Sequence, residues 1–306
     1  MIRKFCLGKT ELRVSAIGLG TWQYSGDWGK TFTEEEVCAL FARARELGFN
    51  LVDTAAGYGD HLAERFLGKA LAGQRDQWVI VSKFGREFWP IGRQHVDCRP
   101  KSVLRQLEDS LRALRTDCID VYLMHSMENE IASNDAVWTV LDKARSAGKI
   151  KHLGISLPPR DKDNIYQTEL ALQYGCDVIE CVYNRLDRQA EDGVFYKAMD
   201  NDLGVLARVP MAQGYLSGKY RPGSVFTDVR AGYYDADTNY DRLSRAVEII
   251  RHEVPQGVAP SEWAMAWSVS HPAVAACIPG FKTIAQLEGG ARAAALLTDD
   301  HPLSVK

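Results

Sequence analysis

The sequence predicts a closed barrel of eight parallel β-strands alternating with helices, formed by one domain that spans residues 1–306. Three observations support this prediction. Eight apolar runs of strand length recur along the chain, and helical patterns separate them. Several of these runs end on an ionisable residue, as expected where parallel strands deliver polar groups to an active site. The chain has the length of a single barrel, and we find no linker, internal repeat or low-complexity segment.

The eight strand signals lie at residues 16–22, 49–53, 78–83, 121–125, 151–156, 177–183, 204–209 and 274–279. The second, third and fourth end on Asp53, Lys83 and His125. Because the carboxyl ends of parallel strands meet at one rim of a barrel, these three side chains are expected there. Tyr58 follows Asp53 by five residues, and a phenol near an ammonium is a proton donor. The arrangement therefore indicates carbonyl or alcohol chemistry.

A doubly wound open sheet is the alternative arrangement of alternating strands and helices. Its dinucleotide-binding form carries a G-x-G-x-x-G turn after the first strand. Here Gly18 and Gly20 begin such a pattern, but Gln23 stands where the third glycine should fall. The closed barrel is therefore favoured.

The intervening helices are predicted from the spacing of apolar residues. Thr33 is expected to cap the first helix, because three glutamates follow it and suit the positive end of the helix macrodipole. The apolar face of this helix consists of Val37, Leu40, Phe41, Ala44 and Leu47. Further helices are expected over residues 62–71 and from Pro100 onwards.

Three segments depart from the repeated strand–helix pattern. Residues 5–14 indicate a hairpin that precedes the barrel, with its turn at residues 8–10. Long loops follow the third strand, over residues 84–99, and the seventh strand, over residues 213–238. Loops of this length in a compact domain are more often functional than idle.

Composition and charge argue against several classes of function. The formal net charge of −3 and the absence of a Lys/Arg block argue against nucleic-acid binding. Seven scattered cysteines without a C-x-x-C pair argue against a disulfide framework and a structural zinc site, so we expect reduced thiols and no metal. No run approaches the roughly 18 apolar residues of a membrane span, and no signal segment opens the chain. A cytoplasmic protein without a membrane partner is expected.

A series of short motifs runs along the chain. They are Gly20-Thr21-Trp22, residues 53–59 (DTAAGYG), Val81-Ser82-Lys83, residues 107–125 with their L-x-x-S-L-x-x-L start, Gly154-Ile155-Ser156, Tyr183-Asn184, residues 210–214 and Ile278-Pro279-Gly280. Each is weak alone, but in this order they resemble the aldo-keto reductase family almost from end to end. The resemblance implies an (α/β)8 TIM barrel with an N-terminal β-hairpin closing its bottom. It also implies an NADPH-dependent oxidoreductase that reduces carbonyl groups without a metal.

By resemblance, the catalytic residues are Asp53, Tyr58, Lys83 and His125. Hydride addition leaves negative charge on the carbonyl oxygen, which a donor must protonate. A free tyrosine has a pKa of about 10, so Lys83 is expected to lower the pKa of Tyr58. Asp53 is expected to keep Lys83 charged and oriented, and His125 to be the second donor to the carbonyl oxygen.

The resemblance also implies a set of cofactor contacts. They are Thr21, Trp22, Asp53, Ser156, Glu180, Arg208, Pro210, Met211, Gln213, Gly214, Gly280, Lys282 and Gln286. At the nicotinamide, Glu180 replaces the family's glutamine and Arg208 replaces an aromatic residue. The Arg208 guanidinium can stack on the ring but would repel its oxidised, cationic form, which favours NADPH over NADP+ and the direction of reduction. Lys282 is the cation expected at the 2'-phosphate, so NADPH is favoured over NADH.

The substrate pocket of a small-molecule carbonyl is expected to be lined by Trp22, Tyr58, Trp89 and His125. Three further residues are expected near its open mouth: Arg185, Arg230 and Tyr233. A sugar-type carbonyl is one candidate substrate. Three alternatives stay open: a dehydrogenase that oxidises a sugar or polyol, a regulatory subunit that binds the cofactor without fast turnover, and an isomerase or lyase on the same fold. The sequence determines neither the substrate nor the oligomeric state.

Overall fold

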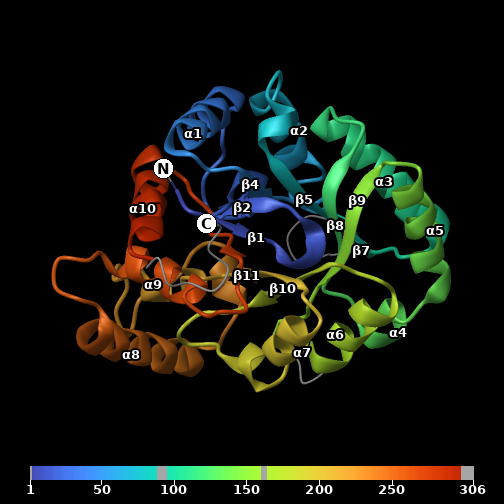
Figure 1. The fold of residues 1–306 in the computed structure, drawn as a ribbon. Coiled ribbons are helices and arrows are strands. Elements are labelled where there is room, and N and C mark those ends of the chain that lie inside the picture. Colours follow the sequence, from blue (N-terminus) through green and yellow to red (C-terminus); the bar gives the residue numbers. More distant parts are fainter. Residues whose placement is uncertain (1, 88–94, 160–163, 298–306) are drawn as a thin grey trace.

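The computed structural model describes residues 2–87, 95–159 and 164–297, and there the chain forms a parallel barrel surrounded by helices (Figure 1). The barrel strands are β3 (Leu19–Gly20), β4 (Leu51–Asp53), β5 (Val79–Phe84), β8 (Ile119–His125), β9 (Ile150–Ser156), β10 (Val178–Val182), β11 (Gly204–Arg208) and β12 (Ala276–Cys277). They form one sheet in this sequence order, and every neighbouring pair is parallel. The eight predicted strands are therefore confirmed.

The barrel closes between its first and last strands. Ile17 bridges Cys277 and Gly20 bridges Gly280, both in parallel, and the Gly18 N–H donates to the carbonyl of Cys277 over 2.8 Å. Because this seam is made of single bridges, β3 and β12 are much shorter than the predicted runs at residues 16–22 and 274–279. Closure pairs the edges that an open sheet would leave free.

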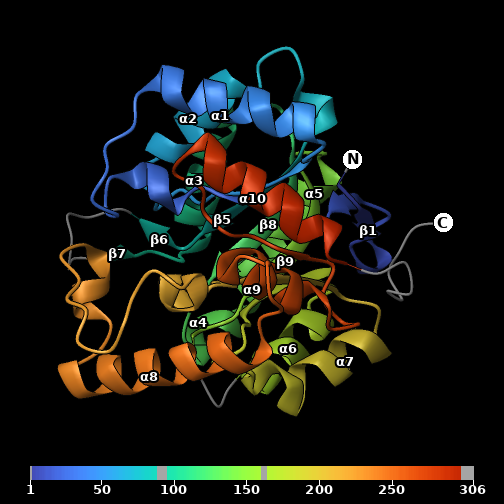
Figure 2. The same cartoon turned by 90° about the vertical axis from the view of Figure 1, so that its left-hand side faces the viewer.

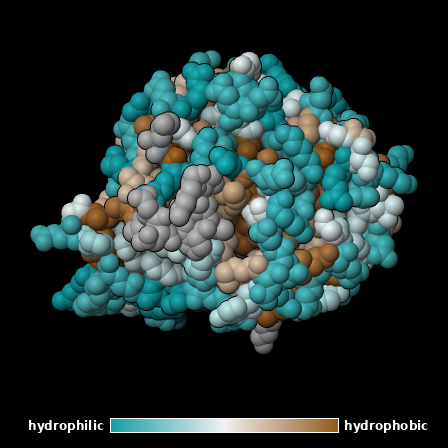
Figure 3. Space-filling model, in the orientation of Figure 1, coloured by the Kyte–Doolittle hydropathy of each residue, from teal (hydrophilic) through white to brown (hydrophobic). Residues whose placement is uncertain are grey.

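The helices lie around the outside of the barrel (Figure 1). They are α1 (Glu34–Leu47), α2 (Leu62–Ala70), α3 (Pro100–Leu114), α4 (Asn129–Ala132), α5 (Asp135–Ser146), α6 (Asn164–Gln173), α7 (Val194–Asp200), α8 (Ala236–Glu253), α9 (Pro260–Val269) and α10 (Ile284–Ala295). Thr33 caps α1 as predicted, in a capping box in which the side chains of Thr33 and Glu36 each accept from the other's backbone N–H. The face seen in Figure 3, which is the end of the barrel that Figure 1 shows in front, is mostly hydrophilic.

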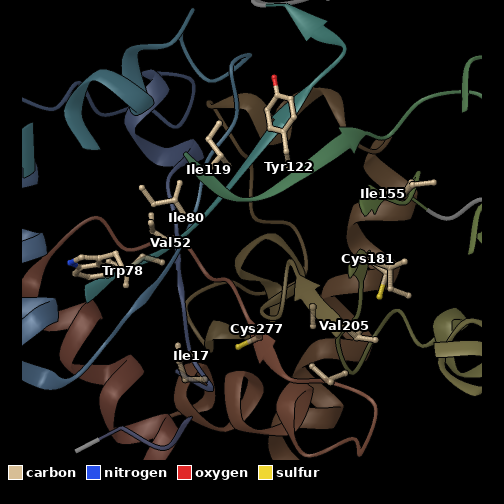
Figure 4. Packing of buried hydrophobic residues seen from close by; sticks show 14 of the residues in the cluster. Ile17, Val52, Trp78, Ile80, Ile119, Tyr122, Ile155, Cys181, Val205 and Cys277 are labelled. Atoms are coloured by element: carbon tan, nitrogen blue, oxygen red, sulfur yellow. The ribbon is translucent and has the colours of Figure 1, made fainter. Parts of the chain in front are cut away.

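Alternate residues of the strands face two different apolar cores. The side chains that point into the barrel form one cluster, which includes Leu51, Val81, Leu123, Val178 and Leu206. The side chains that point outward pack beneath the helices and include Val52, Ile80, Tyr122, Ile155, Cys181 and Val205 (Figure 4). The two-residue period of a strand therefore determines which side chains reach the interior of the barrel.

The N-terminal hairpin closes one end of the barrel. Strands β1 (Lys4–Cys6) and β2 (Arg13–Ser15) pair in antiparallel fashion around the 3-10 turn η1 (Gly8–Thr10), where the sequence predicts the turn. Leu7 and Val14 are fully buried and join the interior cluster of the barrel. Figure 1 shows the hairpin crossing the barrel, and Figure 2 shows β1 at the end remote from β6 and β7.

Both predicted long loops contain short regular elements. The loop after β5 carries β6 (Arg86–Glu87) and β7 (His95–Val96), which pair in antiparallel fashion, and its residues 88–94 lie outside the described residues. The remaining 3-10 turns among the described residues are η2 (Trp22–Ser25), η3 (Arg75–Gln77), η4 (Gln189–Asp192), η5 (Ala212–Ser217) and η6 (Val229–Gly232). The last two belong to the loop after β11.

The seating of the hairpin against β11 can be tested with two glycines. Gly8 has a φ of +51°, and a Cβ there would lie 2.3 Å from the backbone nitrogen of Gly204. Gly73 has a φ of +72°, but a Cβ there would meet nothing within 4 Å. Both alanine variants would carry the strain of a left-handed residue, and Gly8→Ala must also displace backbone. We expect it to lower the free energy of unfolding by about 1–3 kcal/mol more than Gly73→Ala. Urea denaturation measures both, and equal losses would contradict this seating.

Candidate active site

The carboxyl-terminal rim of the barrel carries a layer of ionisable side chains. Each follows an interior apolar residue by two positions, so the alternation of the strand points it into the barrel. The layer consists of Asp53, Lys83, His125, Glu180 and Arg208, which follow Leu51, Val81, Leu123, Val178 and Leu206. The structure thus brings the three predicted strand ends together and places two further predicted residues, Glu180 and Arg208, in the same layer.

Lys83 is fully buried, and two carboxylates surround its ammonium. Asp53 of β4 is ion-paired with it, and Oε2 of Glu180 on β10 lies 3.3 Å from its Nζ. Lys83 also donates to the backbone carbonyl of Thr54 over 3.1 Å. Burial acts to lower the pKa of Lys83, but the two carboxylates outweigh burial and raise it above its ordinary value. Lys83 therefore carries a positive charge inside the barrel.

Tyr58 lies in the loop after β4, with its ring close to this ammonium. The Lys83 Nζ is 5.5 Å from the ring centroid. The ring is nearly parallel to that of Trp22, with centroids 6.0 Å apart, and meets the His125 ring edge-on at 5.9 Å. Burial raises the pKa of the Tyr58 phenol, Lys83 opposes the rise, and the two carboxylates add to it. The pKa of Tyr58 is therefore raised overall, opposite to the sequence expectation. The reason is that the phenol is removed from water and lies near two carboxylates as well as the ammonium.

His125 presents a neutral imidazole to the site. Burial lowers its pKa well below the ordinary value, and the cations of Lys83, Arg86 and Arg208 lower it further. The Arg86 guanidinium donates to the backbone carbonyl of His125 over 2.9 Å. Nδ1 of His125 has no hydrogen-bond partner among the described residues. A neutral imidazole has one N–H to donate, so His125 can act as a hydrogen-bond donor without carrying charge.

Three of the residues predicted at the nicotinamide lie together on neighbouring strands. The Ser156 hydroxyl donates to Oε1 of Glu180 over 3.1 Å, and Nε of Arg208 lies 3.6 Å from the same oxygen. Arg208 also donates to the backbone carbonyl of Leu157 over 2.9 Å. Thr21 is buried just after the end of β3, and its hydroxyl donates to the backbone carbonyl of Asp53 over 3.0 Å.

The predicted loop after β11 turns sharply at the mouth of the barrel. Gln213 and Gly214 both have left-handed backbone angles, with φ of 56° and 97°. Arg230 donates to the backbone carbonyl of Gln213 over 3.3 Å and is ion-paired with Asp228 at 2.6 Å. The loop also contains Pro210, which is buried, and Met211, which is partly buried.

The predicted phosphate-binding segment begins just before α10. Lys282 donates from Nζ to the backbone carbonyl of Trp28 over 2.6 Å, and its own N–H donates to Oε1 of Gln286 over 2.7 Å. Gly280 forms the bridge that closes the barrel beside Gly20. Lys282 is thus tied to one segment that is distant in the sequence, through Trp28, and to the first turn of α10, through Gln286.

The structure adds residues that motif reasoning missed. Trp22 donates from Nε1 to Asp27 over 3.1 Å and packs edge-on against Trp28, with centroids 5.2 Å apart. Nothing in the sequence marks Asp27, Trp28 or Arg86 as active-site neighbours. Of the residues expected at the mouth, Tyr233 lies 6.4 Å from Trp22 between ring centroids.

Two expectations at the mouth have other outcomes. Arg185 is ion-paired with Glu253 of α8 at 2.7 Å, on an outer helix, and so does not serve as a free cation at the rim. Trp89 lies outside the described residues.

The donor set at the rim fits a nicotinamide cofactor. Within the described ranges, Glu180 Oε2 and Arg208 Nε make no hydrogen bond although both are in ion pairs, so an acceptor and a donor remain for a carboxamide. No group of three or more His, Cys, Asp or Glu side chains in the described part of the chain could hold a metal ion. None of the described helices is long and apolar enough to cross a bilayer.

Comparison of the chain with known proteins identifies its family. The model that describes the Aldo/keto reductase family matches residues 16–303. Two Escherichia coli (strain K12) proteins are similar: an NADH-specific methylglyoxal reductase, 31% identical over 241 residues (72% of each chain), and methylglyoxal reductase YeaE, 30% identical over 282 residues (92% of this chain, 86% of the relative). The holo form of aldo-keto reductase AKR11C1 from Bacillus halodurans matches with a TM-score of 0.81 at 27% identity, covering 99% of this chain and 94% of that one. This chain therefore belongs to the aldo/keto reductase family and is an NAD(P)H-dependent oxidoreductase with the family's (α/β)8 fold.

Proposed function

We propose that this protein reduces an aldehyde or ketone to the alcohol, with NADPH as the hydride donor and Tyr58 as the general acid. The observation that supports this most is the buried ammonium of Lys83, ion-paired with Asp53 and 5.5 Å from the Tyr58 ring. A fixed positive charge beside a phenol stabilises the phenolate that forms when the proton leaves. Little else explains a buried lysine that faces a tyrosine at the mouth of a barrel, since burying a charge is costly.

Each residue's task follows from its position. The cofactor, when bound, supplies the hydride that adds to the carbonyl carbon. Tyr58 transfers its proton to the developing alkoxide, and Lys83 stabilises the phenolate that is left. Neutral His125 donates a second hydrogen bond to the same oxygen. The raised pKa of Tyr58 keeps the phenol protonated, and therefore able to donate, until the alkoxide develops.

Two groups of residues are proposed to hold the cofactor. Ser156, Glu180 and Arg208 would bind the nicotinamide end, beside Thr21 and Trp22. The segments that would hold the phosphates and the adenosine end contain Pro210, Met211, Gln213, Gly214, Gly280, Lys282 and Gln286. Lys282 supports NADPH, because a 2'-phosphate offers this cation a charged partner. The name of the NADH-specific relative keeps NADH as the competing cofactor.

The substrate is proposed to be a small polar carbonyl compound. The Tyr58 ring lies against both Trp22 and His125, and we expect the three residues to offer a substrate an aromatic surface and two hydrogen-bond donors, which suits a compact polar molecule. Sugar-type aldehydes fit this description. Two relatives are named methylglyoxal reductases, so methylglyoxal is the first compound to test.

Removing the phenolic hydroxyl tests the proposed function directly. Oxidation of NADPH and NADH is followed over methylglyoxal and over simple, aromatic and sugar aldehydes. Tyr58→Phe should lower kcat by about 10²- to 10⁴-fold, because only the proton donor is lost, and the Kd for NADPH should not change. Tyr24→Phe is the matched control, since it removes a buried hydroxyl of the turn η2 whose distance to the Phe281 carbonyl is 3.5 Å.

Either of two results would contradict this proposal. Turnover that survives in Tyr58→Phe would exclude this phenol as the general acid. Cofactor binding by the wild type without turnover of any aldehyde would exclude the reductase and favour the oxidative or regulatory alternatives.

Lys282→Met tests the choice of cofactor. Loss of one charge-assisted bond to the 2'-phosphate should raise the Kd for NADPH about tenfold, while the Kd for NADH stays unchanged. Lys219→Met is the control, because Lys219 is an exposed cation whose charge acts on Lys282. Equal weakening of both cofactors would mean that Lys282 supports the loop through Trp28 instead of binding a phosphate.

The depressed pKa of His125 predicts the pH dependence of reduction. A free histidine titrates at about pH 6.5, but the imidazole here becomes charged only at lower pH. We therefore expect kcat/KM to show no inflection near about pH 6.5, since His125 is already neutral there. A pH profile of wild type and His125→Asn checks this. An inflection near that pH that disappears in His125→Asn would contradict it.

A further inference from the structure

Glu180 bridges two cations in the interior of the barrel. The residue is 1% exposed. Oε2 lies 3.3 Å from Nζ of Lys83, while Oε1 lies 3.6 Å from Nε of Arg208 and accepts from the Ser156 hydroxyl over 3.1 Å. The two oxygens of one carboxylate therefore face two different positive charges.

With both carboxylates ionised, the layer holds two negative and two positive charges, although burial and Glu180 act to raise the pKa of Asp53 and only Lys83 opposes them. Asp53 and Glu180 are the two carboxylates, and Lys83 and Arg208 are the two cations. Without Arg208, two carboxylates would share a single buried ammonium. An uncompensated buried charge is strongly unfavourable, so the remaining groups would have to move or change their protonation.

We propose that Glu180 and Arg208 are a coupled pair of positioning residues, in which Glu180 competes with Asp53 for the Lys83 ammonium and Arg208 counterbalances Glu180. Through Lys83 the pair sets how strongly the ammonium acts on Tyr58. This inference rests on the proposed function. It gives both residues a role in the reaction besides cofactor contact.

The electrostatics at Tyr58 follow the same pattern. Among the charges that act on the phenol, Glu180 raises the pKa of Tyr58 and Arg208 lowers it. The titratable and charged groups that face this layer are Asp53 from β4, Lys83 from β5, His125 from β8, Arg208 from β11, Arg86 from β6, and Tyr58 and Tyr233 from loops. Cys181 follows Glu180 on β10, and its side chain points outward. Removing either member of the pair alone should therefore shift the acidity of Tyr58 in opposite directions.

The pairing also changes what Arg208 is expected to do at the nicotinamide. A lone guanidinium would repel the oxidised ring, which is why the sequence favoured NADPH over NADP+. In the structure the guanidinium lies beside a carboxylate, which compensates its charge. The wild type should therefore prefer NADPH over NADP+ less strongly than a protein in which Arg208 had no carboxylate partner.

A double-mutant cycle in the full chain tests the pair. Glu180→Gln and Arg208→Met preserve side-chain length, and the readouts are kcat and KM for NADPH-dependent reduction across pH, using the best aldehyde of the panel. Arg208→Met should lower kcat by up to about tenfold with a smaller change in KM, because a rise of one unit in the pKa of Tyr58 makes the phenol a tenfold weaker acid. Glu180→Gln should restore most of that kcat. Glu180→Gln alone should lower the pKa of Tyr58, so the activity that is lost as the phenol ionises should be lost at a lower pH than in the wild type.

A matched control separates pairing from general loss of charge. Arg86→Met also removes a guanidinium from the rim, but Arg86 donates to the backbone carbonyls of His125 and Ser126. Its effect should not be rescued by Glu180→Gln. Rescue of both arginine variants, or of neither, would overturn the proposal, since a simple structural role predicts no selective rescue.

The free energy of unfolding gives a readout that does not depend on turnover. If the pair is coupled, Arg208→Met should destabilise the protein more when Glu180 is present than when it is glutamine. Additive effects in both kcat and unfolding would overturn the inference while leaving the reductase assignment intact. If the wild type reduces no aldehyde, the proposed function fails, and the unfolding cycle still decides whether Glu180 and Arg208 are coupled.

Discussion

The buried ammonium of Lys83 is the interaction on which the rest of the site depends. A charge with no exposed surface requires partners of opposite sign, and breaking a buried pair by removing one partner typically costs about 3–5 kcal/mol. The requirement explains why Asp53 and Glu180 both face Lys83 from different strands. It also explains why a second cation, Arg208, lies beyond Glu180. The polar rim is therefore a single charge-balanced unit, and changing one of its members alters the environment of the others.

The barrel makes this unit possible because apolar residues and ionisable residues occupy different layers along its axis. Leu7 and Val14 of the hairpin fill the amino-terminal end, and the middle is filled by residues such as Leu51 and Val178. The ionisable side chains of the site occupy the next interior layer, towards the carboxyl-terminal rim. Because each strand contributes alternate residues to the interior, the change from apolar to charged happens within two positions on several strands. The apolar layers exclude water from below, which strengthens the electrostatic interactions above them.

The acidity of Tyr58 illustrates how competing effects combine in such a site. The ammonium of Lys83 favours the phenolate, but loss of water and the two carboxylates act in the other direction and prevail in the free protein. A phenol that stays protonated is suited to donation, provided that the phenolate is stabilised once the proton has moved. The balance between Glu180 and Arg208 is then a means of adjusting this acidity without altering the donor itself.

Much of this protein was determined by the sequence alone. The period of apolar residues identified all eight strands, and the spacing around Thr33 identified its capped helix. The ionisable residues at or next to the ends of β4, β5 and β8 predicted where Asp53, Lys83 and His125 would meet. These features follow from local patterns, since strand alternation and capping depend on residues close in sequence. The tertiary structure decided that β3 and β12 join through single bridges, that Arg185 pairs with α8, and that the pKa of Tyr58 moves upward. It also decided that Glu180 lies between Lys83 and Arg208. Such contacts join strands far apart in sequence, and they depend on barrel closure, side-chain reach and burial, which no local pattern specifies.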